Sequence, residues 1–381
     1  MIPEPEIFDA VVVGGGPAGT AAALALRRAG CSVAVLERTF YDDVRLGETV
    51  PPEIRSPLTR LGVWERFLAA GHRPSMAFVS AWGSPELACR DFLFSPWGHA
   101  WHLDRCRFDA MLATAAEEAG ALVLRGAHVG AAAQLADRWR VSGMRGDRAF
   151  ALHGRYLLDA TGRAAGLVRK LGGRLRSLDR LVGLAAYLEP GPTAAPLAGE
   201  VLLEAAEDGW WYSAPLPGQR AVAAFLTDSR AATPDAARWW SRLGETAHTS
   251  HRLADFRRPS SLIVRPAQTR WSEPPPAPRF LAIGDAAAAF DPLSSQGILK
   301  ALRSGLRAAE AVVAHRAGEC GALMDHQAGT ARETAEYLAL RAAYYGAEDR
   351  WPRSTFWRSR RTLGTETRPA PGHLTSREVA S

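Results

Sequence analysis

The feature that most constrains the fold is Gly14-Gly15-Gly16-Pro17-Ala18-Gly19, which fits the spacing G-x-G-x-x-G. The run Ile7 to Val13 before it is apolar and β-branched, and Ala18 to Ala29 after it has helical composition. Ser32 to Leu36 is a second buried strand, and Glu37 stands at its end. In such a βαβ unit the glycines allow a tight turn, the approach of a pyrophosphate to the backbone and close helix packing. We therefore predict a dinucleotide site in which the helix N-terminus attracts phosphate and Glu37 binds the adenosine ribose.

A second element, near the other end of the chain, indicates which dinucleotide binds. Gly284-Asp285-Ala286-Ala287 follows the apolar strand Phe280 to Ile283. An aspartate at a strand end can accept hydrogen bonds from ribityl hydroxyls, which FAD has and NAD lacks, so we predict FAD. The chain has no second G-x-G-x-x-G, so NAD(P)H, if it is the direct reductant, has to bind transiently outside a dedicated Rossmann site.

The chain alternates between two kinds of pattern, which predicts two interleaved domains. The predicted parts are 1–74, 101–180 and 269–345 for the FAD-binding domain, 75–100 and 181–268 for a smaller substrate domain, and 346–381 for an aromatic and basic C-terminal segment. The predicted class is α/β, with a Rossmann-like FAD-binding domain of the aromatic-hydroxylase type, a mixed or antiparallel substrate sheet and a helical C-terminal region. The tail from Thr362 is polar and is expected to be disordered.

The composition indicates where in the cell the protein is located and which classes of partner it does not bind. Hydrophobic residues make up 47% and charged residues 23%, as in a soluble globular enzyme, and glycines or charges interrupt every long apolar stretch. Met1 to Glu6 lacks the features of a secretory signal, and neither the four cysteines nor the pair His248 and His251 has metal-ligand spacing. The net charge of +6 comes from dispersed arginines, since only Lys170 and Lys300 are lysines. We expect a cytoplasmic protein that binds no metal, nucleic acid or membrane.

Five motifs resemble, in their order, the flavoprotein hydroxylase superfamily over residues 7 to 345. They are Gly14 to Gly19, Glu37, Asp104-Arg105, Asp159-Ala160-Thr161-Gly162 and Gly284-Asp285. The resemblance implies that Arg105 lies close to FAD and that Gln296-Gly297 opens a helix whose positive end faces the flavin pyrimidine. The residues expected to bind the cofactor are Gly14, Gly16, Pro17, Ala18, Gly19, Glu37, Arg38, Arg45, Arg105, Asp159, Gly284, Asp285, Pro292, Gln296, Gly297 and Ile298.

The superfamily contains hydroxylases, halogenases, geranylgeranyl reductases and epoxidases, so the fold alone does not select a reaction. Asp291 to Ile298 and Gly209 to Pro215 look like the branch nearest the tryptophan halogenases. Those enzymes carry a lysine beside the substrate, past the Gly-Glu loop, whereas the first lysine here is Lys170. The halogenase motif W-x-W-x-I-P is also altered, to Trp210-Trp211-Tyr212-Ser213-Ala214-Pro215. Halogenation is therefore disfavoured.

Other motifs resemble the LodB-like flavoproteins, which are quinone-cofactor maturases. These motifs are Gly47 to Pro52, Ser80 to Ser84, Trp101 to Arg105, the Trp-Trp-Tyr segment, Arg350 to Pro352 and Phe356-Trp357. The resemblance implies an FAD-dependent monooxygenase that inserts oxygen from O₂ into a tryptophan of a precursor quinoprotein during tryptophylquinone biogenesis. Its reductant is expected to be NAD(P)H or reduced flavin from a partner reductase.

Such a reaction needs aromatic walls and hydrogen-bond donors more than a protein nucleophile. The candidates for the flavin and substrate site are Glu48, Trp82, Trp211, Tyr212, Pro292, Ser294, Ser295 and Gln296. Each has a structural alternative, since the aromatic residues can pack a sheet, Glu48 can be a solvated loop charge and the serines can cap a helix. Trp351, Phe356 and Trp357 are expected to fold back on the core.

Two other functions stay open at the level of the sequence. One is a hydroxylase of a small indole or phenol, which requires a closed pocket. The other is a non-catalytic, FAD-containing escort protein. The sequence does not define the oligomeric state.

Overall fold

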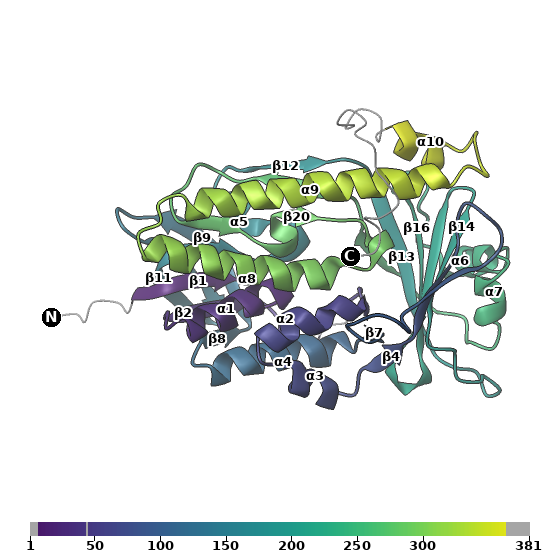
Figure 1. Ribbon diagram of the computed structural model, residues 1–381, viewed down its shortest axis with the longest axis horizontal. Coiled ribbons are helices and arrows are strands. Elements are labelled where there is room, and N and C mark those ends of the chain that lie inside the picture. Colours follow the sequence, from purple (N-terminus) through teal and green to yellow (C-terminus); the bar gives the residue numbers. More distant parts are fainter. Residues whose placement is uncertain (1–6, 43–44, 363–381) are drawn as a thin grey trace.

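Two large sheets lie towards opposite ends of the longest axis in the computed structural model, which describes residues 7–42 and 45–362 (Figure 1). Helix α9, Ala322–Ala347, runs along the upper edge from one sheet to the other. The predicted α/β class with an interleaved second sheet is confirmed. The predicted disordered tail and the Met1 to Glu6 segment lie outside the described residues, apart from Thr362 itself.

The first sheet contains the strand that leads into the glycine motif. Its order is β8-β2-β1-β11-β10-β9, and β19 pairs with the last part of β11. The bounds are β1 Ile7–Val13, β2 Val33–Glu37, β8 Leu122–Arg125, β9 Ala127–Gln134, β10 Trp139–Arg145, β11 Arg148–Asp159 and β19 Phe280–Ala282. Strands β1, β2, β8, β11 and β19 pair in parallel, and β9 and β10 are antiparallel. Val11 and Val12 are fully buried because this sheet is covered on both faces.

Three helices pack together against the first sheet, namely α1 Pro17–Arg28, α4 Arg105–Glu118 and α8 Gly297–Arg316. Helices α1 and α8 approach closely because Gly305 faces α1. A Cβ atom at Gly305 would lie 2.2 Å from the carbonyl oxygen of Ala18. The N-terminal regions of both helices lie in the same part of the molecule, since a Cβ atom at Gly284, after β19, would lie 2.6 Å from Ala18 of α1 and 3.9 Å from Ala301 of α8.

The second sheet has the order β17-β13-β16-β15-β14-β5-β6 and joins strands from two distant segments of the chain. The bounds are β5 Ala77–Ala81, β6 Ala88–Asp91, β13 Leu181–Leu188, β14 Val201–Ala206, β15 Gly209–Pro215, β16 Ala221–Asp228 and β17 Ile263–Pro266. Strand β5 pairs with β14 in parallel, and the other pairs are antiparallel. Helices α6 Ala236–Leu243 and α7 Thr249–Arg252 lie against this sheet.

Short elements complete the described part of the chain. The helices are α2 Arg55–Arg60, α3 Trp64–Ala69, α5 Gly166–Lys170 and α10 Thr355–Thr362. One small sheet has the order β3 Thr49–Val50, β7 Ala100–His102 and β4 Arg73–Ser75. Another has the order β12 Arg174–Ser177, β18 Arg270–Glu273 and β20 Ala288–Ala289. Helices α2 and α3 are separated at Gly62, whose φ is +60°. Helix α8 begins at Gly297 and not earlier, because Ser295 has a left-handed backbone with φ of 52°.

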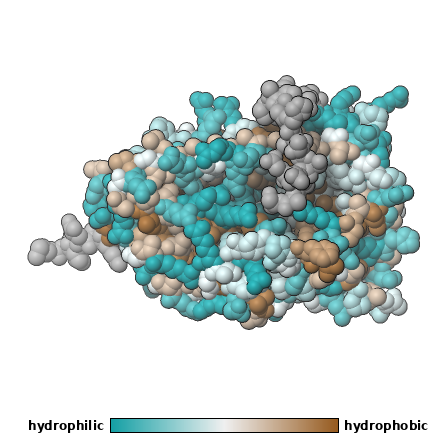
Figure 2. All heavy atoms as spheres, viewed as in Figure 1, coloured by the Kyte–Doolittle hydropathy of each residue, from teal (hydrophilic) through white to brown (hydrophobic). Residues whose placement is uncertain are grey.

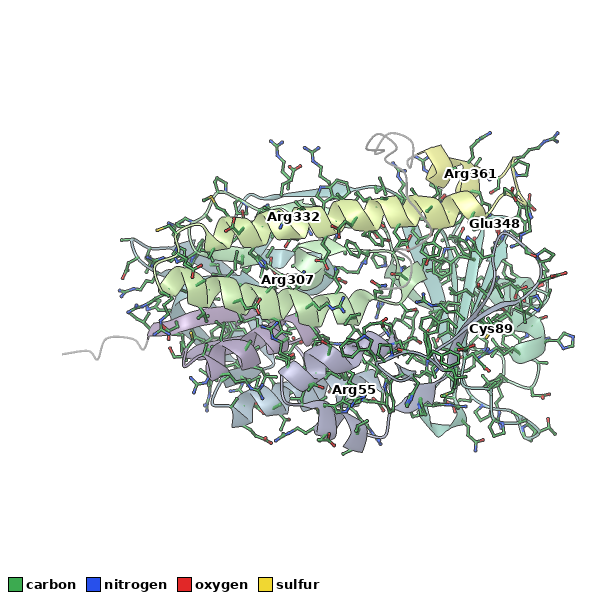
Figure 3. All side chains as sticks on the ribbon, in the orientation of Figure 1. Arg55, Cys89, Arg307, Arg332, Glu348 and Arg361 are labelled. Atoms are coloured by element: carbon green, nitrogen blue, oxygen red, sulfur yellow. The ribbon has the colours of Figure 1, made fainter. Side chains whose placement is uncertain are left out.

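The C-terminal aromatic residues fold back on the second sheet, as expected. Phe356 and Trp357 are buried, and Trp351 packs against the same cluster. Glu348, which Figure 3 labels at the end of α9, is fully buried and accepts a hydrogen bond of 2.8 Å from the backbone N–H of Gly83 after β5. The C-terminal segment therefore fastens α9 to the substrate sheet.

Candidate functional site

The glycine motif forms a tight turn with open space in front of α1. A Cβ atom would lie 2.1 Å from the Ala160 carbonyl oxygen at Gly14 and 1.9 Å from the Gly14 carbonyl oxygen at Gly19. Both positions therefore require glycine. At Gly16, the N-cap of α1, the nearest atom to a Cβ would be Nη1 of Arg45 at 3.9 Å, and the first turn has neither a side-chain cap nor an acidic residue. The positive end of α1 is available to a phosphate.

Glu37 is buried beside this turn and organises it. One carboxylate oxygen accepts a hydrogen bond of 2.7 Å from the N–H of Gly15, and the other accepts one of 2.7 Å from the hydroxyl of Thr39. Arg45 pairs with Glu37 at 3.2 Å and with Asp109 at 3.1 Å. The predicted ribose contact of Glu37 stays a prediction. The neighbouring Arg38 is exposed.

Arg105 lies between α4 and the loop that carries Glu48. Its guanidinium donates hydrogen bonds to the carbonyl oxygen of Leu46 at 3.0 Å and pairs with Asp109 at 3.0 Å. Its positive charge opposes the rise that burial causes in the pKa of Glu48 and, after Lys300 and Arg163, helps to lower the pKa of Asp285. Arg105 is therefore within electrostatic range of a cofactor residue and a substrate-site candidate at the same time.

Asp285 is held as an ionised acceptor. Burial alone would raise its pKa, but the Lys300 ammonium, 2.9 Å from Oδ1, and the Arg163 guanidinium bring the pKa below its ordinary value. A carboxylate can accept hydrogen bonds from ribityl hydroxyls. Sequence reasoning did not assign Lys300 or Arg163 to this site, although Arg163 directly follows the motif Asp159 to Gly162.

Asp159 has a different role from the one expected. Its Oδ1 accepts hydrogen bonds from the N–H and hydroxyl of Thr161, and its Oδ2 accepts from the N–H groups of Leu167 and Val168. Both oxygens are occupied by protein donors. The expectation that the Asp159 side chain contacts the cofactor is corrected to a role in shaping the turn after β11.

The turn before α8 is the second open helix end. Pro292, Gln296 and Gly297 are exposed there, and a Cβ atom at Gly297 would meet nothing within 4 Å. Gln296 is the N-cap, so neither Ser294 nor Ser295 caps α8, and the first turn of α8 has no acidic residue. The side chain of Ile298 is buried in the core, so it can offer only its backbone to a ligand.

These features fit FAD. The two uncapped helix ends of α1 and α8 suit the pyrophosphate and the electron-rich pyrimidine edge of the flavin, and an ionised Asp285 suits the ribityl chain. Within residues 7–42 and 45–362, no group of three or more His, Cys, Asp or Glu side chains is placed to hold a metal ion. No helix in this part of the chain is long and apolar enough to cross a membrane.

The second sheet turns one face, carrying Tyr212 and Tyr187, towards Glu48 and Thr49. Tyr187 donates a hydrogen bond to Oε1 of Glu48, and the hydroxyl of Tyr212 lies 2.7 Å from that of Thr49. The Thr49 hydroxyl is also 2.9 Å from Nδ1 of the buried His102. Glu48 is therefore buried in a hydrogen-bonded network and is not a solvated loop charge.

The structure separates the aromatic candidates. Trp211 lies on the opposite face of β15 from Tyr212, fully buried, with its ring centroid 5.0 Å from those of Phe225 and Trp239. Trp82 packs on Trp357 at 5.1 Å, and its indole N–H donates to the carbonyl oxygen of Tyr344. The expectation that Trp211 lines the substrate site is corrected, because its ring is fully buried in the core, whereas Trp82 is half-buried and its place in the site stays a prediction.

The turn from Pro292 to Gly297, called the flavin-facing turn below after its predicted role, and the Tyr212 face lie close together. Leu293 of the turn and Tyr212 both pack against the aromatic cluster that contains Trp210 and Tyr345. Val50, next to Thr49, packs in the same core cluster as Ile298. The residues brought together are Glu48, Tyr187, Tyr212, Arg105, Asp285 and the turn from Pro292 to Gly297.

Comparison with known proteins agrees with this geometry. A family model described as an FAD binding domain matches residues 8–336. LodB of Marinomonas mediterranea, named as an FAD-dependent oxidoreductase, is 32% identical over 369 residues, which cover 93% of this chain and 97% of LodB.

Solved structures share the fold. The flavin-dependent halogenase CmlS has a TM-score of 0.82 and 26% identity, and the match covers 93% of this chain and 68% of CmlS. The peptidyl tryptophan dihydroxylase QhpG has a TM-score of 0.77 and 24% identity, covering 93% and 79%. The chain therefore belongs to the FAD binding domain family and is an FAD-dependent oxidoreductase of the flavin monooxygenase type.

Proposed function

We propose that this protein hydroxylates a tryptophan side chain of a precursor protein during the formation of a tryptophylquinone cofactor. The observation that carries the proposal is the buried Glu48 network beside the flavin-facing turn, which contains hydrogen-bonding groups but no lysine. QhpG, which shares the fold, is named for tryptophylquinone biogenesis, while CmlS is named a halogenase. The fold thus admits both reactions, and the residues of the site have to decide between them.

FAD, once bound and reduced, activates dioxygen so that one oxygen atom can be transferred to an electron-rich ring. The N-terminus of α1 would hold the pyrophosphate, Asp285 the ribityl chain, and the N-terminus of α8 the pyrimidine edge. Burial favours the protonated form of Glu48, which shares Oε1 with the Tyr187 hydroxyl. Glu48 can therefore hold a proton beside the reacting ring, while Tyr212 orients that ring.

The positions of the two lysines support hydroxylation over halogenation. Lys170 bonds to the carbonyl oxygen of Gly130 on β9, within the first sheet. Lys300 is buried against Asp285 and the carbonyl oxygen of Ala288, with its Nζ 4.4 Å from the Phe290 ring centroid. Both amines are engaged by protein groups, so neither is free to carry an activated halogen to a substrate.

An exposed apolar segment beside the Tyr212 face supports a polypeptide substrate. Leu93, Phe94 and Trp97 have exposed fractions of 74%, 91% and 41%. The segment begins at Phe92, whose ring packs 5.1 Å from that of Phe78, and Phe78 packs in the same cluster as Tyr212. Figure 2 shows a face that is mostly hydrophilic, with hydrophobic residues in small separate groups. An exposed apolar group beside a reactive site suits docking of a protein.

The test is mass spectrometry of candidate precursor proteins co-expressed with this protein or with its Gly16→Asp variant. A gain of oxygen on one tryptophan, dependent on Gly16, supports the proposal. An unmodified precursor together with NAD(P)H oxidation stimulated by free indoles or phenols points to a small-molecule hydroxylase. FAD binding with precursor association but no oxygen consumption points to an escort protein, and a halogenated product would contradict the assignment made from the lysines.

A further inference from the structure

A buried ion triad joins the flavin-facing turn to the substrate sheet. Arg341, on α9, donates from Nε to Oδ2 of Asp291 at 3.0 Å and from Nη2 to Oδ2 of Asp179 at 2.6 Å. The side chains are only 3%, 1% and 4% exposed for Arg341, Asp291 and Asp179. One arginine therefore pairs with two carboxylates that come from different parts of the chain.

Asp291 directly precedes the flavin-facing turn and shapes it. Its Oδ1 accepts a hydrogen bond of 3.0 Å from the N–H of Leu293, and its own N–H donates to the hydroxyl of Tyr337 at 3.0 Å. The Tyr337 ring stacks on that of Phe290 at 3.7 Å. Two residues of α9, Tyr337 and Arg341, thus hydrogen-bond to Asp291, which begins the segment that leads to the N-terminus of α8.

Asp179 lies two residues before the start of β13, the strand that carries Tyr187. Its Oδ1 accepts a hydrogen bond of 3.0 Å from the N–H of Leu181 at the start of that strand. Helix α9 is in turn fixed to α8 by the pair Arg307 and Glu333, and at its end by Glu348 to Gly83 (Figure 3). The triad is consequently the point where the turn, α9 and the substrate sheet meet.

We propose that Arg341 is a positioning residue, which fixes the position of Pro292 to Gly297 relative to the substrate sheet. This position in turn determines how tightly the protein binds FAD and which groups surround the flavin. Removal of its guanidinium would leave Asp179 and Asp291 buried without a counter-charge. An uncompensated buried charge is strongly unfavourable, so the carboxylates would separate or become protonated. Either response moves the turn that presents the N-terminus of α8 to the cofactor.

The experiment compares FAD binding by Arg341→Met, Arg341→Lys and Asp179→Asn with that by Arg360→Met. Arg360 is a matched control because it is 1% exposed and pairs with Asp228 at 2.8 Å, on α10 and β16, and its charge acts on Asp179 without a hydrogen bond to Asp179 or to Asp291. The readouts are the dissociation constant of FAD, the fine structure of its visible absorption and its midpoint potential. All are measured without substrate, so the result does not depend on the reaction proposed above.

Arg341→Met is expected to weaken FAD binding by about tenfold and to shift the spectrum and the potential. Asp179→Asn should shift them in the same direction by less, although Asp179 is not part of the flavin-facing turn, and Arg341→Lys should restore part of the loss. Arg360→Met should lower Tm and leave all three flavin readouts unchanged. The inference is overturned if Arg341→Met binds FAD like the wild type, or if Arg360→Met produces the same shifts. Where Arg341→Met does not fold, unchanged flavin readouts in both Asp179→Asn and Arg341→Lys overturn it.

Discussion

The phenol of Tyr187 donates a hydrogen bond to the buried carboxyl of Glu48, which joins the loop before β3 to strand β13 of the substrate sheet. Burial raises the pKa of Glu48 above its ordinary value, and the bonds from Tyr187 and the N–H of Gly47 offset this only in part. The carboxyl of Glu48 consequently binds its proton more tightly in the folded protein than in the unfolded chain.

The first prediction concerns the pH dependence of stability in Glu48→Gln. Because the folded pKa of Glu48 lies above the unfolded one, its stabilisation is complete below the unfolded pKa and is lost as pH rises through the folded pKa. The Tm of the wild type should therefore fall relative to that of Glu48→Gln as pH rises above about 4. The exposed Glu86→Gln serves as the control, and a pH-independent difference for Glu48→Gln would contradict a raised pKa of the buried carboxyl.

The second prediction compares Gly16→Asp with Gly16→Asn. A Cβ atom at Gly16 points into open space, so both variants should fold with the Tm of the wild-type apoprotein. The aspartate places a negative charge where the α1 N-terminus would hold the pyrophosphate, which should cost roughly 2 kcal/mol, or about 30-fold in FAD affinity, beyond the effect of asparagine. Fluorescence titration at low and high salt measures this, and the gap should narrow at high salt. Equal affinities would show that no phosphate lies at this helix end.

The third prediction uses the two faces of β15. Trp211→Phe leaves space in the core between the sheet and α6 and should cost about 1–3 kcal/mol of stability, with turnover per folded molecule unchanged. Tyr212→Phe removes a hydroxyl that bonds Thr49, which should cost only about 1 kcal/mol but should lower turnover by about tenfold. Chemical denaturation and oxygen incorporation into the precursor are the two measurements. A loss of turnover in Trp211→Phe that exceeds the loss in Tyr212→Phe would reverse this assignment of the faces.

The fourth prediction concerns acid stability and His102. Burial lowers the pKa of His102 from 6.5 to about 4, so the unfolded chain binds the proton more tightly than the folded protein. Stability should then fall as pH decreases from 6.5 through 4, by about 3 kcal/mol for this group. His102→Asn should flatten the curve over that window in urea unfolding experiments. An unchanged slope would mean that folding does not lower the pKa of His102.

The sequence predicted the nucleotide-binding unit well because its signals are local. The turn at Gly14, the helix after Gly16 and the acidic Glu37 are close in the chain, and their arrangement follows from backbone geometry. FAD and the α/β class are confirmed. Strand β9 has no strong local signal because Ala127–Gln134 is rich in alanine, which has low strand propensity, and the pairing with β10 holds the segment extended.

The substrate site was predicted less well because its geometry depends on contacts between distant residues. The pattern Trp210-Trp211-Tyr212 shows alternation but not which face meets the flavin, and that is set by the packing of α6 on one side and of Tyr345 and Trp357 on the other. Arg341 and Asp179 carry no local signal, since they are joined only when α9 folds over the turn. A buried arginine in a helix, opposite an Asp-Pro turn, is the pattern that could have indicated them.

Strand β11 pairs with β1 on one side and with β19 on the other, so the sheet that carries the cofactor site is complete only after β19 has been made. Asp285 follows Gly14 by 271 positions, so the ribosome adds these two parts of the site at different times. At about 5–20 residues per second, the delay between them lasts tens of seconds. During this time β1 and β2 have no complete cofactor site beside them, so FAD is expected to bind only after β19 and the α8 turn have been made.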